Sequence, residues 1–284
     1  MNHTTYAVRV GIGRGLSEFR QSLRSSQDWM FYVVVGLGSL AYLWANRATP
    51  VEGTDLLLPS LVLPSMLGGL VVFGGIVGPA FTLAIEREDG TLLRAKAVPH
   101  GITGYVSGQF LFQSIGVLPM LVVLLVPSAL LFDGLMHQGA QGWLVVAGYL
   151  VLGLATCLPI GFIIGSLATS PNKVSTWGML PVIGLAIVSG IFVPLSSLPG
   201  WLQGVAQVFP MYWVGLGMRS AFLPDSAAAL EIGGSWRTLE TVVVLVLWAV
   251  VSMLLLPPLL RRMARRESGS SVEARRQERM QRVG

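Results

Sequence analysis

The sequence EREDGTLLRAKAVPHG, residues 86–101, separates two long apolar runs and sets the architecture of the chain. Neither residues 56–85 nor residues 98–132 contain an Asp, Glu, Lys or Arg. A charged side chain at membrane depth costs about 3 kcal/mol. The charged block therefore predicts an aqueous loop between two membrane spans.

The same block predicts a short helix. Its acidic residues precede its basic residues, as the helix dipole favours, and Pro99 ends the pattern. Such a helix is suited to docking into a groove of a cytosolic partner. An ordinary charged connection without a partner accounts for the spacing equally well.

Composition places the whole chain in a membrane. Of 284 residues, 53% are hydrophobic and 12% are charged, and the mean hydropathy is +0.68; a soluble domain has about 25% charged residues. The single Cys157 excludes an intramolecular disulfide, and the three histidines are too far apart in sequence to suggest a metal site. The Arg runs flank apolar segments rather than a soluble fold, so nucleic-acid binding is not indicated.

Residues 1–28 predict an amphipathic helix on the cytosolic membrane surface. Apolar residues recur at helical spacing while arginines occupy other faces. The apolar stripe consists of Val8, Ile12, Leu16, Phe19 and Leu23. A solvated tail with chance periodicity is the alternative.

Residues 29–260 predict an all-α domain of six transmembrane helices, followed by a basic cytosolic tail, 261–284. The expected spans are 29–45, 56–85, 102–131, 143–169, a fifth within 174–193, and 239–260. The second is long for a hydrocarbon core of about 30 Å and must be tilted or broken. Its many Gly and Pro residues fit either a moving wall of a translocation path or tight helix packing.

The choice between six and seven spans depends on how residues 174–218 are divided. With six spans and a cytosolic N-terminus, all but three of the 19 Lys and Arg face the cytosol; those three are Arg47, Arg219 and Arg237. Seven spans would place the Arg-rich tail outside, against the positive-inside rule. Residues 194–213 then predict a re-entrant helical segment on the outer side, because Pro199 to Val208 is too short to cross.

A polar face on the third span is predicted to contact either another helix or a watery path. Gln109 and Gln113 lie four residues apart and therefore on the same side of a helix. A glutamine amide in hydrocarbon requires a hydrogen-bond partner, and helix contact is the favoured reading.

The sequence contains no ATP-hydrolysis motif of the P-loop type. The only lysines, Lys96 and Lys173, are followed by Ala and Val, so G-x-x-x-x-G-K-[ST] is absent. If the protein transports a solute, the energy is expected to come from another polypeptide.

Two motifs resemble the membrane subunit of type-2 ATP-binding-cassette (ABC) exporters. The first is E-R-E-x-G-T with a Pro eight positions beyond the Thr; the second is SGIFVPLSSLPGWLQGVAQVFPMY, residues 189–212. The resemblance covers nearly the whole chain and is greatest with drug and antibiotic efflux permeases. It implies two permease copies, identical or similar, and two copies of a separate ATPase subunit that binds ATP and Mg²⁺; this chain itself is expected to hold no cofactor. It further implies that the second and fifth spans line the path, in a bacterial cytoplasmic membrane with both termini cytosolic.

The resemblance also implies roles for individual residues. The coupling helix that contacts the ATPase corresponds to Glu86, Arg87, Glu88, Gly90, Thr91, Leu92, Leu93 and Pro99. The re-entrant segment corresponds to Pro194, Leu198, Pro199, Trp201 and Pro210. We hypothesise that the three charged residues at 86–88 position the coupling helix, while Leu92 and Leu93 pack into the ATPase.

Two other functions are compatible with the composition. One is a membrane scaffold or sensor that moves nothing, and the other is a carrier with its own ion coupling. Copurification with a Walker-type ATPase would distinguish the exporter from both.

Overall fold

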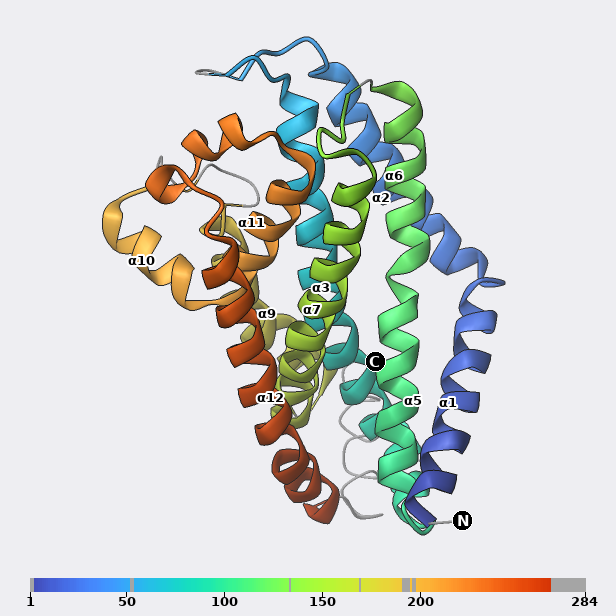
Figure 1. Cartoon of the computed structure of the whole chain (residues 1–284). Coiled ribbons are helices and arrows are strands. Elements are labelled where there is room, and N and C mark those ends of the chain that lie inside the picture. Colours follow the sequence, from blue (N-terminus) through green and yellow to red (C-terminus); the bar gives the residue numbers. More distant parts are fainter. Residues whose placement is uncertain are drawn as a thin grey trace.

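The computed structural model describes residues 3–51, 54–132, 134–168, 170–190, 195 and 198–266, and these form a helical bundle (Figure 1). The long helices are α1 (His3–Ser22), α2 (Ser26–Ala45), α3 (Leu58–Glu88), α5 (Gly101–Gly116), α6 (Leu118–Leu131), α7 (Gly139–Leu167) and α12 (Thr238–Arg266). The shorter helices are α4 (Thr91–Lys96), α8 (Pro171–Lys173), α9 (Met179–Ile187), α10 (Gly200–Val208) and α11 (Pro210–Phe222). A π-helical turn, η1, spans Val174–Gly178, and two 3₁₀ turns, η3 and η4, span Asp225–Leu230 and Ile232–Gly234.

Among the described residues, five helical segments are long and apolar enough to cross a membrane: α2, α3, α5 with α6, α7 and α12. The expected fifth span coincides with α8, η1 and α9, which together are helical from 171 to 187. Part of that expected span, residues 191–193, lies outside the described residues. The bundle therefore confirms an all-α membrane protein, and six spans remain a prediction.

Helices α3 and α7 form the centre of the bundle and pack on each other along their length. Glycines bring the two backbones together: a Cβ on Gly161 would lie 2.4 Å from the Ile76 carbonyl oxygen, and one on Gly165 would lie 2.8 Å from that of Ala80. Close approach of this kind gives membrane helices their packing contacts.

The second predicted span is a single unbroken helix. Although Pro64 and Pro79 lie inside α3, it continues for 31 residues, or about 46 Å. The break that we considered for this span is therefore absent. The helix also extends further than expected, because Glu86, Arg87 and Glu88 belong to its last turn and not to the loop.

The third predicted span is interrupted directly before Pro119 but not at Pro127. Helix α5 ends at Gly116 and α6 begins at Leu118, while Pro127 lies inside α6. Pro119 stands in the first turn of α6, where the missing N–H has no helical acceptor to lose.

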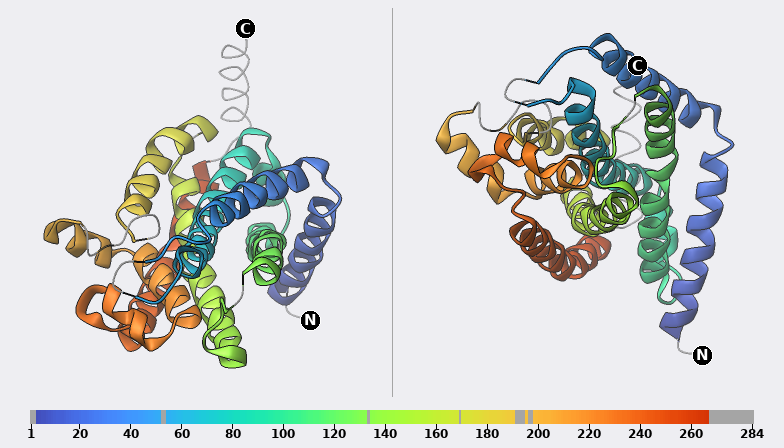
Figure 2. Two further views of the ribbon diagram at one scale, coloured as in Figure 1. Left: turned by 90° about the horizontal axis from the view of Figure 1, so that it is seen from above. Right: turned by 45° about the horizontal axis from the view of Figure 1, so that its top comes forward.

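Helix α1 is packed alongside α5 at the periphery of the bundle (Figures 1 and 2). The expected apolar stripe is largely exposed, with Ile12 at 42% and Leu16 at 41%. The buried face is a different one and carries Ala7, Gly11 and Gly15. The amphipathic helix is thus present, but it ends at Ser22 and a small-residue face joins it to the bundle.

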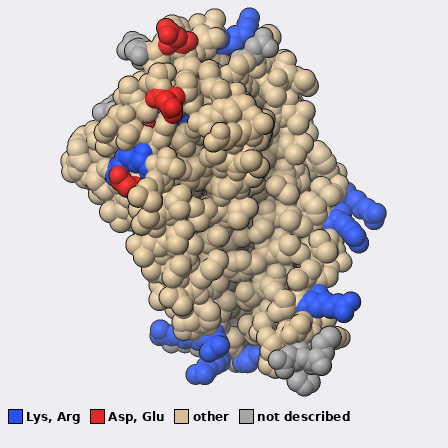
Figure 3. All heavy atoms as spheres, viewed as in Figure 1, with Lys and Arg blue, Asp and Glu red and all other residues tan. Residues whose placement is uncertain are grey.

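The first and last described residues of the chain lie at the same end of the bundle (Figure 1). Helix α4 contacts both α5 and the terminal part of α12, and α1 begins beside the start of α5. In the face shown in Figure 3, basic side chains gather at this lower end, and the visible acidic ones lie in the upper half. This distribution is the one that the positive-inside rule requires of a cytosolic end.

Candidate coupling site at the charged end of the bundle

The chain reverses direction between α3 and α4 at Gly90. Its φ of 80° lies in the left-handed region, which a residue with a Cβ rarely adopts. Asp89 Oδ1 then accepts a hydrogen bond of 2.8 Å from the Thr91 backbone N–H, and Arg94 donates one of 2.8 Å to the Thr91 hydroxyl. The D-G-T sequence thus starts α4 at a fixed angle to α3.

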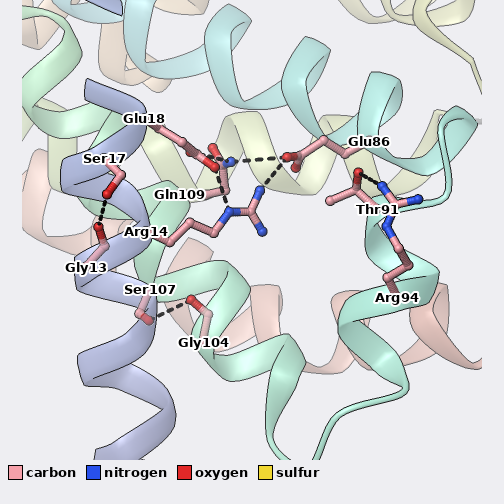
Figure 4. A network of polar contacts seen from close by, with 10 residues as sticks. All are labelled: Gly13, Arg14, Ser17, Glu18, Glu86, Thr91, Arg94, Gly104, Ser107 and Gln109. Atoms are coloured by element: carbon pink, nitrogen blue, oxygen red, sulfur yellow. Dashed lines mark hydrogen bonds and ion pairs between the residues drawn. The ribbon is translucent and has the colours of Figure 1, made fainter. Parts of the chain in front are cut away.

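Glu86 faces the interior of the protein, where it joins helix α1 to α3 (Figure 4). Arg14 donates to Glu86 Oε1 at 2.8 Å and to Glu18 Oε1 at 2.6 Å. Gln109 of α5 donates to Glu18 Oε2 at 3.1 Å and lies 3.4 Å from Glu86 Oε1. Three helices are therefore held together through one cluster of polar side chains.

Arg14 remains cationic within this cluster. Burial lowers the pKa of its guanidinium, but the hydrogen bond that Arg14 donates to Glu18 and the charges of Glu18 and Glu86 outweigh that effect, and its pKa lies above the ordinary value. The Arg14 guanidinium also lies over the ring of Tyr105, with its Cζ 5.3 Å from the centroid.

Arg87 is buried on another face of α3, where it holds the end of α7. Its Nη1 donates to the carbonyl oxygens of Ser166, at 3.2 Å, and of Ala168. These carbonyls belong to the last turn of a helix, where they lack N–H partners and carry the negative end of the helix dipole. Arg87 thus ties the α7 terminus to the turn that leads into α4.

Replacing Arg87 with methionine is expected to lower the free energy of unfolding by about 2 kcal/mol, because it leaves buried carbonyls without a charged donor. Thermal unfolding of the purified chain measures this effect. Arg94→Met is the matched control, since the Arg94 side chain is exposed and bonds only within α4. Equal shifts for the two variants would contradict the capping role.

Helix α4 uses its two leucines differently. Leu92 is 1% exposed and packs with Leu83, Tyr105 and Phe162 in the interior. In this arrangement the Leu92 side chain is already packed within the chain, and its contact with the ATPase stays a prediction. Leu93 is half-buried, and the exposed surface of the turn is formed by Arg94, Lys96, Ala97, Val98, Pro99 and His100.

The polar face of the third span contacts neighbouring helices. In addition to the bonds of Gln109 described above, Gln113 donates to the Thr82 hydroxyl of α3 at 3.1 Å. Both glutamines thus form hydrogen bonds to side chains of neighbouring helices, as expected if this face serves helix contact.

The predicted outer segment is a helix followed by a second, buried one. Helix α10 has nearly the expected bounds; Trp201 projects outward with 70% exposure, Leu198 packs against the core and Pro199 is exposed. Pro210 is buried at the start of α11. Pro194 lies outside the described residues.

A family model described as "ABC-2 family transporter protein" matches residues 47–256, which is most of the chain. The chain belongs to the ABC-2 family. This ABC-2 protein is 25% identical to the "Putative transport permease YvfS" of Bacillus subtilis (strain 168), over 70% of this chain and 74% of the relative. It is 24% identical to the "Daunorubicin resistance ABC transporter permease protein DrrB1" of Streptomyces coeruleorubidus, over 61% of this chain and 70% of the relative.

Sequence reasoning missed the contribution of α1 to the charged end of this ABC-2 protein. Arg14 and Glu18 stand four residues apart with opposite charges, which is the spacing of a helix-surface pair. That spacing signals an internal bond, but nothing local indicates that Glu86, 72 residues away, completes the cluster.

A second ion pair in the ABC-2 protein, which is buried more deeply than the first, was also missed. Arg219 of α11 bonds Glu231 Oε1 at 2.5 Å and Oε2 at 3.2 Å, and the two side chains are 4% and 8% exposed. Arg219 also lies 3.3 Å from the Ser65 hydroxyl of α3 and 3.2 Å from the Gly190 carbonyl oxygen after α9. The pair therefore joins α3, α9 and α11 to the loop before α12.

Proposed function

We propose that the chain is the permease subunit of an ABC exporter. Two copies, or one copy and a similar chain, form the translocation path, and two copies of a separate ATPase subunit bind ATP with Mg²⁺ and supply the energy. Family membership supports the permease class, and the absence of a P-loop motif in the sequence supports a separate ATPase.

The observation that carries the coupling role is the attachment of α3 on both sides of its last turn. Glu86 bonds α1 on one side and Arg87 bonds α7 on the other, just before the chain turns into α4. Because these contacts are short and mostly buried, a displacement of α4 moves α1, α3 and α7 together. If the bundle has one conformation open to each side of the membrane, a rigid link of this kind can favour one of the two conformations.

The surface that α4 and its following turn present is suited to docking. Arg94 and Val98 are exposed at the tip of the bundle, whereas Glu86 and Arg87 are turned inward. We propose that the exposed side chains contact the ATPase and that the inward pair transmits its movement. This assigns the E-R-E motif to transmission rather than to contact.

The cargo proposed is hydrophobic or amphipathic: a drug, an antibiotic or a lipid. The bundle supplies few polar groups at membrane depth, and one relative carries daunorubicin resistance in its name. The end that carries α4 and the arginines of α12 is proposed to face the cytosol of a bacterium, with both termini on that side.

The double substitution Arg94→Glu and Val98→Glu tests the docking surface. In proteoliposomes that contain the chain and its copurified ATPase, we expect at least a tenfold loss of transport-stimulated ATP hydrolysis. The two introduced carboxylates would be buried at the interface or would face charges of the same sign, and either disfavours contact. Thermal stability should be unchanged, since both side chains are exposed. Arg47→Glu, at the opposite end of the bundle, is the control.

Two results would overturn the proposal. Transport by the chain alone under an ion gradient would make it a carrier. Failure of the native chain to copurify with any Walker-type ATPase, with no transport activity, would favour a scaffold or sensor.

A further inference from the structure

An apolar groove of about 530 Å³ lies between η1 and α9 on one side and α7 and α12 on the other. Its floor includes Ile76 and Val182, and its walls include Ile164, Leu185 and Trp248. At one end it is bounded by the α10–α11 junction, where Phe209 stacks on Trp248 with ring centroids 6.2 Å apart. The groove touches the coupling site described above only at Ala168, whose carbonyl accepts from Arg87.

Lys173 is the one charged residue among those that line the groove. Its side chain is exposed, and no hydrogen bond or ion pair of its ammonium group occurs among the described residues. The lining therefore combines a long apolar surface with a single free cation at its end.

The length of the groove fits one leaflet of a bilayer. From Lys173 to Leu185 the chain is helical, which corresponds to about 18 Å at 1.5 Å per residue. Half of a hydrocarbon core is about 15 Å. With Lys173 at the membrane surface, the far end of the groove lies near the bilayer midplane.

A π-helical turn forms part of one wall of the groove. Residues 174–178 form a π-helical turn, an arrangement often found at functional sites. Within it, Trp177 is 81% exposed, and a Cβ on Gly178 would lie 3.0 Å from Ile164 Cγ2 on the opposite wall. A larger residue than glycine at 178 would narrow the groove.

We infer that the groove binds one anionic phospholipid of the leaflet on the Lys173 side. An acyl chain occupies the apolar surface, and the phosphate pairs with the Lys173 ammonium. Charge complementarity selects the headgroup, because a basic residue near the surface attracts anionic lipid. The length of one leaflet selects a resident lipid rather than a molecule in transit across the whole membrane.

The test uses the purified full-length chain in nanodiscs with a photoactivatable phosphatidylglycerol that carries a diazirine on its acyl chain. The expected result is crosslinking within η1 and α9, at several times the yield of the matching phosphatidylcholine probe. Lys173→Gln should reduce the preference for the anionic probe about fivefold, the contribution of one basic residue. Arg94→Gln, an exposed cation at the same end outside the groove, should leave it unchanged.

A second variant separates the acyl site from the charge. Leu185→Trp fills the groove and should abolish labelling of η1 and α9 by both probes. Leu180→Trp should not, because the Leu180 side chain of α9 is 64% exposed and lies outside the groove lining. Equal labelling by the two headgroups in the native chain would overturn the inference. Labelling of η1 and α9 that is unchanged by Leu185→Trp would also overturn it. So would a lack of labelling in the native chain because a second copy or a cargo molecule covers the groove. The measurement needs no ATPase, so its outcome is independent of the proposed exporter activity.

Discussion

Replacement of Arg219 by methionine is expected to lower the free energy of unfolding by about 3 to 5 kcal/mol. The substitution leaves the Glu231 carboxylate, which is 8% exposed, buried without its counter-charge. It also removes the donor to the Ser65 hydroxyl and to the Gly190 carbonyl. Three segments, which carry Ser65, Gly190 and Glu231, lose their common partner at once, so the effect exceeds that expected for Arg87.

The ion pair itself is tested by a double substitution. Arg219→Met with Glu231→Met removes both charges, and it should recover most of the stability lost by the single variant, because an apolar pair of similar volume avoids the buried charge. The solvent-accessible pair of Arg237 and Glu240 is the control: Glu240 is 54% exposed, and Glu240→Gln should cost less than about 1 kcal/mol. Unfolding in a denaturing detergent titration measures all variants. Similar losses for Arg219→Met and Glu240→Gln would rule out a buried pair as the source of the stability.

The second large effect is expected at Gly11, where α1 meets α5. A Cβ at this position would lie 2.0 Å from the Gly104 carbonyl oxygen and 2.3 Å from the Ser107 hydroxyl oxygen. A neighbouring contact repeats the constraint, because a Cβ on Gly15 would lie 2.4 Å from the Gly108 carbonyl oxygen. Each helix thus carries a G-x-x-x-G pair, and backbone contacts backbone without room for a methyl group.

Gly11→Ala should therefore separate α1 from α5 and break the bond from Arg14 to Glu86. Hydrogen exchange of the α1 amides reports the separation, and it should accelerate at least tenfold. Gly13→Ala is a matched control in the same helix, because nothing lies within 4 Å of its Cβ position. There the higher helix propensity of alanine should stabilise the helix by about 1 kcal/mol or less. The α1 amides of Gly13→Ala should therefore exchange somewhat more slowly than those of the native chain. Protected α1 amides in Gly11→Ala would show that the close approach is not what holds the helix.

The order of spans could be predicted from the sequence because it depends on local quantities. Apolar run length locates α2, α3, α7 and α12, and the prolines at 199 and 210 locate α10 within one residue. The short helix in the charged block was also predictable, although its true start at Thr91 depends on Gly90. The order of charges along the block suggested that the short helix begins at Glu86. In the structure Glu86 lies in the last turn of α3, the preceding helix.

The inward orientation of Glu86 and Arg87 could not be predicted, since it depends on partners distant in sequence. Arg14 is 72 residues from Glu86, and Ala168 is 81 residues from Arg87. The packing face of α1 was missed for a related reason. Hydrophobic periodicity selects large apolar side chains, while the face that contacts α5 consists of residues with almost no side chain, such as Gly11 and Gly15.

Helix α11 has a consequence for how the protein is made. All of its 13 residues are buried, among them Arg219, and its neighbours α3, α7 and α12 flank it in space but not all precede it in the chain. A segment of this length cannot span a bilayer by itself, and part of its buried surface is covered only after α12 has been synthesised. The docking of α11 is therefore completed only after translation of the last span, although the partners of Arg219, namely Ser65, Gly190 and Glu231, all precede α12 in the chain.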